Sequence, residues 1–138
     1  MWKALRDAKA KDIMTKEIQS VEKDITVAEA TSLMDKNNIG SVMVVNAIHD
    51  PLGIFTERDL LRRVVAKGLD PKKTKMSQVM TPHLHCAQAS DNALEILQVM
   101  CSANFRHLPV LDGKKLVGIV SLKDFYDFFL KDQASGGV

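Results

Sequence analysis

The stretch Gly53-Ile-Phe-Thr-Glu-Arg-Asp59 occurs a second time, with the same pattern, as Gly118-Ile-Val-Ser-Leu-Lys-Asp124. Each copy has an apolar run through a glycine, then a hydroxyl residue, and a carboxylate three positions after the hydroxyl. An apolar helical pattern follows, beginning with Leu60 in the first copy and Phe125 in the second. Internal repetition of this kind indicates repeated structural units. The repeat therefore decides the predicted fold.

The similarity extends to both sides of this stretch. Asp12-Ile-Met-Thr15 is echoed by Gln78-Val-Met-Thr81, and Asp112-Gly113 is a strong hairpin signal between two apolar runs. Apolar periodicity predicts strand, helix, strand, strand and helix in each copy. These elements fall at 18–21, 27–34, 39–45, 52–55 and from 56 onward in the first copy, and at 84–87, 93–100, 105–111, 116–120 and from 121 onward in the second.

The fold class predicted from this order is α/β (α+β), with two β-α-β-β-α repeats packed face to face by a pseudo-twofold. Each repeat is near the lower size limit of an independently folding unit, which favours a shared interface. The predicted organisation is a lead-in at 1–10, repeats at 11–67 and 77–131, a linker at 68–76 and a disordered tail at 132–138.

Composition narrows the class of protein. The chain has 138 residues, of which 46% are hydrophobic and 26% charged, as expected for a globular domain. A net charge of +2 is too weak to favour nucleic acid as a partner. Two cysteines suggest no disulfide framework. With no apolar run near 20 residues and a charged start, we expect a cytoplasmic protein and no membrane partner.

With these motifs in view, the chain resembles a pair of cystathionine-β-synthase (CBS) domains, often called a Bateman module. The match covers residues 11–131, and its most specific parts are the two glycine-to-aspartate stretches and Arg106-His-Leu-Pro-Val110. The resemblance implies a stand-alone regulatory module and not an enzyme. It implies binding of AMP, ADP, ATP, NAD or S-adenosylmethionine in clefts between the repeats, with no cofactor or metal, and a homodimer that could act on a protein effector.

The two stretches at residues 53–59 and 118–124 are called the signatures below. Their residues leave two interpretations open. Thr56 with Asp59, and Ser121 with Asp124, have the spacing of a helix-capping box, which needs no ligand. The same helix N-terminus suits a phosphate, and a carboxylate in the first turn can accept the hydroxyls of a ribose. Since a capping aspartate can still face a cleft, the two interpretations are compatible.

The resemblance also implies how the site residues are shared between two clefts. The first joins one copy's final helix to the other copy's strands, and would contain Thr56, Asp59, Leu84, His85, Cys86, Arg106, His107 and Pro109. The second would contain Ile18, Ser20, Gly40, Ser41, Ser121 and Asp124. Because an arginine and a histidine can bind phosphate together, we expect the first cleft to be occupied.

Three other functions are weighed against this one. A ligand-free dimerisation scaffold, in which the signature residues only cap helices, is the main alternative. His83, His85 and Cys86 are too few for a structural zinc site. Neither cysteine has a base at a recognisable spacing, which disfavours nucleophilic catalysis. The row Arg58, Arg62 and Arg63 is interpreted as a solvated helix face, with phosphate contact or partner docking as the alternative.

Overall fold

The structure is a computed structural model that describes residues 2–82 and 85–134 and divides into two compact units. Unit 1 contains residues 2–18 and 85–134, and unit 2 contains residues 19–82. Both units are mixed α/β, in agreement with the predicted fold class. The final helix continues to Ala134, so residues 132–134 are helical, while 135–138 lie outside the described residues.

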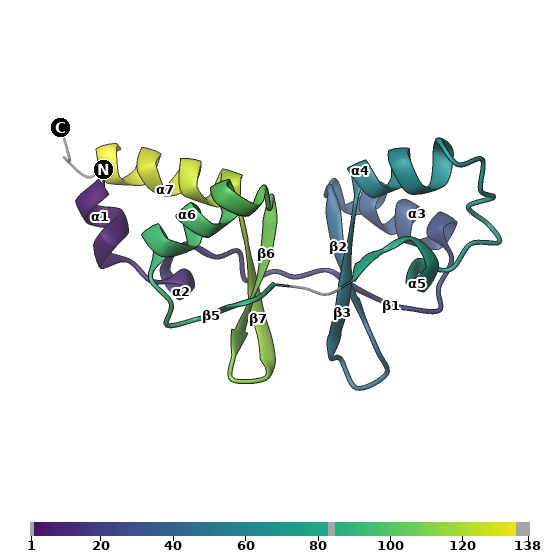
Figure 1. The fold of residues 1–138 in the computed structure, drawn as a ribbon, viewed down its shortest axis with the longest axis horizontal. Helices are drawn as coiled ribbons and strands as arrows, with labels where there is room; N and C mark the ends of the chain where they lie inside the picture. The colour runs from purple at the N-terminus through teal and green to yellow at the C-terminus, as the bar shows by residue number, and fades with distance from the viewer. Residues whose placement is uncertain (1, 83–84, 135–138) are drawn as a thin grey trace. The chain divides into compact units, whose positions relative to one another are not determined.

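Unit 2 is built around a mixed sheet in the order β1-β2-β3-β4 (Figure 1). β1 is parallel to β2, and the β2–β3 and β3–β4 pairs are antiparallel. Helices cover one face of this sheet. Its elements are β1 (Ser20–Glu22), α3 (Val27–Asn37), β2 (Ser41–Val45), β3 (Pro51–Thr56), α4 (Glu57–Asp59), the π-helical η1 (Leu60–Val65), α5 (Met76–Val79) and β4 (Thr81–Pro82).

Unit 1 repeats this plan with the sheet order β5-β6-β7. β5 is parallel to β6, and β6 and β7 form the antiparallel hairpin that Asp112-Gly113 predicted. Its helices again lie on one face of the sheet (Figure 1). Its elements are α1 (Trp2–Asp7), α2 (Ala10–Ile13), β5 (Ala87–Gln88), α6 (Ala93–Ala103), β6 (His107–Asp112), β7 (Lys115–Ser121) and α7 (Leu122–Ala134).

The compact units do not coincide with the sequence repeats, because each echoed Met-Thr segment pairs with the hairpin of the other copy. Thr15 forms an antiparallel bridge to Ile119, and Thr81 pairs with Ile54 in β3. The glycines of the signature make this close approach possible: a Cβ on Gly53 would lie 2.7 Å from both the Met80 sulfur and the Thr81 carbonyl oxygen. The repeated glycine is thus explained by packing.

The helices α3 and α6 begin and end with matching caps. Thr26 accepts a hydrogen bond from the Glu29 amide, and Asn92 accepts from two amides of the first turn of α6. Each helix ends at an asparagine in the left-handed region, Asn38 at φ 52° and Asn104 at φ 58°. Asparagine tolerates this conformation better than most side chains.

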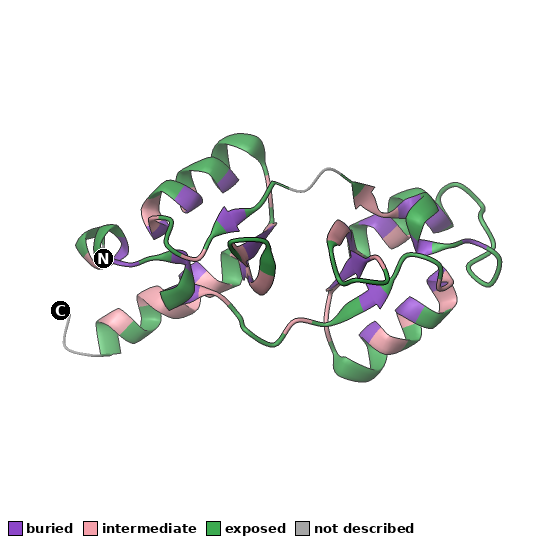
Figure 2. Cartoon of the chain, turned by 90° about the horizontal axis from the view of Figure 1, so that it is seen from below, coloured by how far each residue is buried: buried purple, intermediate pink, exposed green. Residues whose placement is uncertain are grey.

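Each unit has its own apolar core, and the buried positions lie on the strands and on one side of the helices (Figure 2). Val42, Met43, Val44 and Val45 are all buried, as predicted for a strand with apolar residues on both faces. In the part of the chain that the structure describes, no helix has the length and apolar character needed to cross a membrane.

Candidate functional site

The first signature carboxylate, Asp59, caps its own helix. Its Oδ2 accepts hydrogen bonds from the Thr56 amide at 3.0 Å and the Thr56 hydroxyl at 3.3 Å. In return, the Asp59 amide donates to Thr56 Oγ1 at 3.3 Å. These reciprocal bonds form the capping box that the spacing predicted. The box explains why α4 begins at Glu57.

The other oxygen of Asp59 faces residues from elsewhere in unit 2. Thr81 Oγ1 donates to Oδ1 at 3.1 Å, and Arg63 Nε lies 3.4 Å from the same atom. Arg63 also donates through Nη1 to the Met80 carbonyl at 3.0 Å. Asp59 is only 8% exposed, so nearly all of its polar surface is satisfied inside the protein. Arg63 is exposed, as expected for the arginine row, but it also ties two segments together.

The second signature carboxylate, Asp124, repeats most of this arrangement in unit 1. Its Oδ2 accepts from the Ser121 amide at 2.7 Å and the Ser121 hydroxyl at 3.1 Å. Its Oδ1 accepts from the Thr15 hydroxyl at 2.7 Å. Thr15 and Thr81 therefore have the same role in the two units. They were not among the predicted site residues, although the echoed Met-Thr motif that ends on them was the available signal.

Strand register places the residues at the start of the hairpin beside each signature. Ser41 pairs with Thr56, and the Glu57 amide donates to the Gly40 carbonyl at 3.0 Å. In unit 1, His107 pairs with Ser121. Burial lowers the pKa of His107, the Asp124 carboxylate partly opposes that shift, and Arg106 adds to it. His107 is thus held toward its neutral form beside Asp124.

The remaining predicted site residues are spread over both units. Ile18 is half-buried, Ser20 and Arg106 are exposed, and Pro109 is buried in β6. The His85 ring lies 4.7 Å, centroid to centroid, from Phe105. Burial raises the pKa of the Cys86 thiol, and Leu84 lies outside the described residues. The grouping of these residues into clefts that join the two copies stays a prediction.

A polar hollow of about 250 Å³ lies next to the first signature in unit 2. Its lining includes Gly40, Glu57 and Leu60, together with the Asp35 side of α3. A Cβ on Gly40 would lie 3.2 Å from the Glu57 carboxyl group. The hollow is therefore acidic, which disfavours an anionic phosphate at that position.

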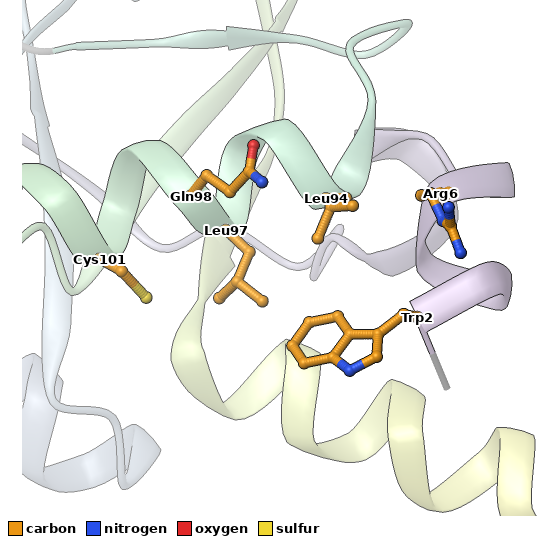
Figure 3. A pocket seen from close by; sticks show the side chains of 6 residues that line it. All are labelled: Trp2, Arg6, Leu94, Leu97, Gln98 and Cys101. Carbon is orange, nitrogen blue, oxygen red and sulfur yellow. The ribbon is translucent and has the colours of Figure 1, made fainter.

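Unit 1 has an apolar groove of about 420 Å³ between α1 and α6 (Figure 3). Leu97 and Cys101 of α6 point toward the same space as Trp2 of α1. The Trp2 ring also contacts Phe129 edge-on, with centroids 6.0 Å apart. The full lining is Trp2, Arg6, Leu94, Leu97, Gln98 and Cys101. The helical pattern around Met100 predicts that Cys101 is a buried small hydrophobe, but Cys101 is exposed in this groove.

Metal binding was not expected, and residues 2–82 and 85–134 contain no group of three or more histidine, cysteine, aspartate or glutamate side chains placed to hold a metal ion. His83, one member of the histidine–cysteine cluster considered from sequence, lies outside the described residues.

Comparison with known proteins identifies relatives along almost the whole chain. The CBS domain family model matches residues 10–66 and again 76–131. The CBS domain-containing protein YhcV of Bacillus subtilis is 33% identical over 126 residues, which are 91% of this chain and 89% of that protein. A meiotically up-regulated protein of Schizosaccharomyces pombe is 40% identical over 100 residues, but the chain covers only 13% of it.

Solved structures share the fold. A CBS-domain-containing protein from Agrobacterium tumefaciens superposes with a TM-score of 0.80 at 30% identity, covering 88% of this chain and 98% of that one. A hexameric CBS-CP12 protein from bloom-forming cyanobacteria has a TM-score of 0.79 at 29% identity, covering 86% of this chain and 66% of that one. The two stretches that the CBS family model matches contain both signature carboxylates, Asp59 and Asp124.

Proposed function

The chain belongs to the CBS-domain family and is a CBS-pair regulatory module, and from this premise we propose that it senses an adenosine-containing nucleotide through Asp59 and Asp124. The ligand class is AMP, ADP, ATP, NAD or S-adenosylmethionine. The ribose hydroxyls donate to the signature carboxylate, and the phosphate of a nucleotide lies toward the start of the helix that carries it. The module passes the bound state to a partner and performs no chemistry itself.

One observation carries this proposal: in both units a carboxylate at the start of the helix that follows the antiparallel hairpin is fixed by the hydroxyl residue three positions before it and by a threonine of the Met-Thr segment. Asp59 and Asp124 each use Oδ2 for their own helix cap and leave Oδ1 to side chains that can rotate away. Carboxylates accept ribose hydroxyls in dinucleotide-binding folds, and Asp59 and Asp124 each lie in the first turn of a helix. In unit 1 the start of α7 adds positive potential for a phosphate, whereas Glu57 at the start of α4 opposes that potential in unit 2.

The test is a calorimetric titration of the purified protein with each nucleotide of that class, followed by native mass spectrometry for stoichiometry. ATP and 2′,3′-dideoxy-ATP form a matched pair, since the second lacks the hydroxyls that the carboxylate would accept. The proposal is supported if ATP binds and if its affinity falls at least tenfold when the diol is removed. The double variant Asp59→Asn with Asp124→Asn should weaken ATP binding by a similar factor. Absence of binding by the whole panel at millimolar concentration contradicts it.

The alternative is a ligand-free scaffold, and the saturation of Asp59 by its own neighbours favours it. In that case the two carboxylates only stabilise their helices, and Asp59→Asn lowers stability without changing the binding of any nucleotide. Self-association is proposed for both functions, because a structurally similar CBS-CP12 protein is hexameric. Light scattering and thermal unfolding with and without ATP distinguish the sensor from the scaffold. Only the sensor changes its assembly or its thermal stability when the nucleotide is added.

A further inference from the structure

The acceptor positions of Asp59 are already filled by the protein. A carboxylate has about four acceptor positions, two on each oxygen. At Asp59, Oδ2 accepts from the amide and the hydroxyl of Thr56, and Oδ1 faces the Thr81 hydroxyl and Arg63 Nε. Three of these contacts are hydrogen bonds and the fourth is an ion pair, and together they cover the four positions. A ribose diol, which brings two further donors, can bind only if some of them leave.

The four donors differ in how easily they can leave. The Thr56 amide is fixed by the backbone of the helix cap, and the Thr56 hydroxyl also accepts from the Asp59 amide. Thr81 lies in β4 and can withdraw its hydroxyl only by a side-chain rotation. Arg63 has the longest contact, 3.4 Å, and its side chain is 46% exposed. Arg63 can therefore move into solvent at the least cost.

Asp124 is different in one respect. Its Oδ2 accepts from Ser121 and its Oδ1 accepts from Thr15. One turn further along α7 lies Phe128, at the position that corresponds to Arg63 in unit 2. One acceptor position on Oδ1 of Asp124 therefore has no donor among the described residues. A ribose diol can therefore donate to one open acceptor position at Asp124 and to none at Asp59.

We propose that Arg63 is a built-in competitor for the first signature site: it occupies Asp59 and keeps that site closed to a ribose diol until it leaves, so Asp124 binds first. This inference rests on the proposed function and adds the order in which the two sites fill. The Arg63 guanidinium also holds the Met80 carbonyl. Departure of Arg63 from the first site thus also breaks its hydrogen bond to Met80, the residue before Thr81.

The test isolates the first site by using the full-length Asp124→Asn protein as the parent. ATP is titrated calorimetrically into this parent, into the parent with Arg63→Met, and into the parent with Arg62→Met. Arg62 is the matched control, since it lies on the same helical turn, is exposed, and forms no ion pair with Asp59 in the described part of the chain. Thr81→Val in the same parent removes the other movable donor with little change in shape.

We expect Arg63→Met to tighten ATP binding by about threefold to tenfold, the effect of removing one charged competitor. Thr81→Val should act in the same direction, and Arg62→Met should leave the affinity of the parent unchanged. The gain should disappear with 2′,3′-dideoxy-ATP. In the protein without any substitution, native mass spectrometry should show one ATP bound before the second.

Two outcomes overturn the inference, and they differ from failure of the proposed function. If the unsubstituted protein binds ATP but Arg63→Met leaves the parent's affinity unchanged or weakens it, Arg63 is not a competitor. If the parent and its Arg63→Met variant both fail to bind ATP while the unsubstituted protein binds it, Asp59 is not a ligand site. If the unsubstituted protein and the Arg63→Met variant bind no nucleotide of the panel, the proposed function itself fails. Circular dichroism of each variant confirms that it is folded.

Discussion

Each Met-Thr segment packs closely against a signature glycine, so alanine at either glycine should destabilise the protein. We predict that truncation of the neighbouring methionine restores stability in one copy more than in the other. In Gly118→Ala, the new Cβ collides with the Met14 sulfur, while the Thr15 carbonyl oxygen is 3.1 Å away. In Gly53→Ala, the new Cβ lies 2.7 Å from the Met80 sulfur and 2.7 Å from the Thr81 carbonyl oxygen. The first clash is with a flexible side chain alone, and the second also involves backbone.

Overpacking of this kind costs about 1–3 kcal/mol of unfolding free energy, from which the loss of glycine flexibility in the unfolded chain returns about 0.4–1 kcal/mol. Both single substitutions should therefore destabilise the protein. Truncation of the methionine should relieve most of the cost at Gly118 but not at Gly53, because the Thr81 carbonyl stays in place. We expect a coupling free energy of about 1 kcal/mol or more between Gly118→Ala and Met14→Ala. The coupling between Gly53→Ala and Met80→Ala should be smaller.

The assay is urea unfolding followed by circular dichroism, applied to the two double-mutant cycles. Gly68→Ala measures the cost of backbone strain without a steric clash, since Gly68 has a positive φ of 68° and no atom lies within 4 Å of a new Cβ. A shift of about 4–8 °C in melting temperature per kcal/mol is expected if each unit unfolds by itself. Equal rescue in the two copies, or wild-type stability of Gly53→Ala, would refute the reasoning.

Three further predictions follow from single contacts. The pKa of His107 in the folded protein lies below its usual value of 6.5 because the side chain is buried, so the unfolded chain binds the proton first as the pH falls. Stability should therefore decrease as the pH drops below about 6.5, and His107→Gln should reduce the pH dependence of the urea midpoint between pH 5 and 7. Asn92→Ala should cost about 1–2 kcal/mol in the same assay, since Asn92 caps α6 and donates to the Arg6 carbonyl at 2.6 Å. Asn104→Ala should destabilise by about 1 kcal/mol because of its positive φ, whereas Asn104→Gly should be tolerated in thermal unfolding.

Sequence reasoning succeeded where the physical cause is local. The period of the apolar residues predicted α3 and α6, which begin at Val27 and Ala93 as expected. The two partners of the capping box, Thr56 and Asp59, are only three positions apart, so their spacing is visible without a structure. The hairpin at Asp112-Gly113 follows from turn chemistry, and Gly113 has the positive φ of 64° that such a turn uses.

It missed Cys101 because a helical pattern does not show which neighbours cover each face. The position beside Met100 indicated a buried residue, and Met100 is indeed 1% exposed. Cys101 lies one position further around α6, in the groove beside Trp2, where α1 leaves it uncovered. The packing of α1 against α6 was not predicted, since the lead-in gave no signal beyond a short helix.

The sequence by itself determined the repeat, the order of the elements, the helix caps and the two signature carboxylates, because all of these depend on neighbours a few residues apart. Only the tertiary structure decided what the free oxygen of each carboxylate contacts. Thr15 and Asp124 are 109 positions apart, and Thr81 and Asp59 are 22 apart. No local pattern encodes such pairs: they form because a glycine lets each Met-Thr segment pack against the hairpin of the other copy.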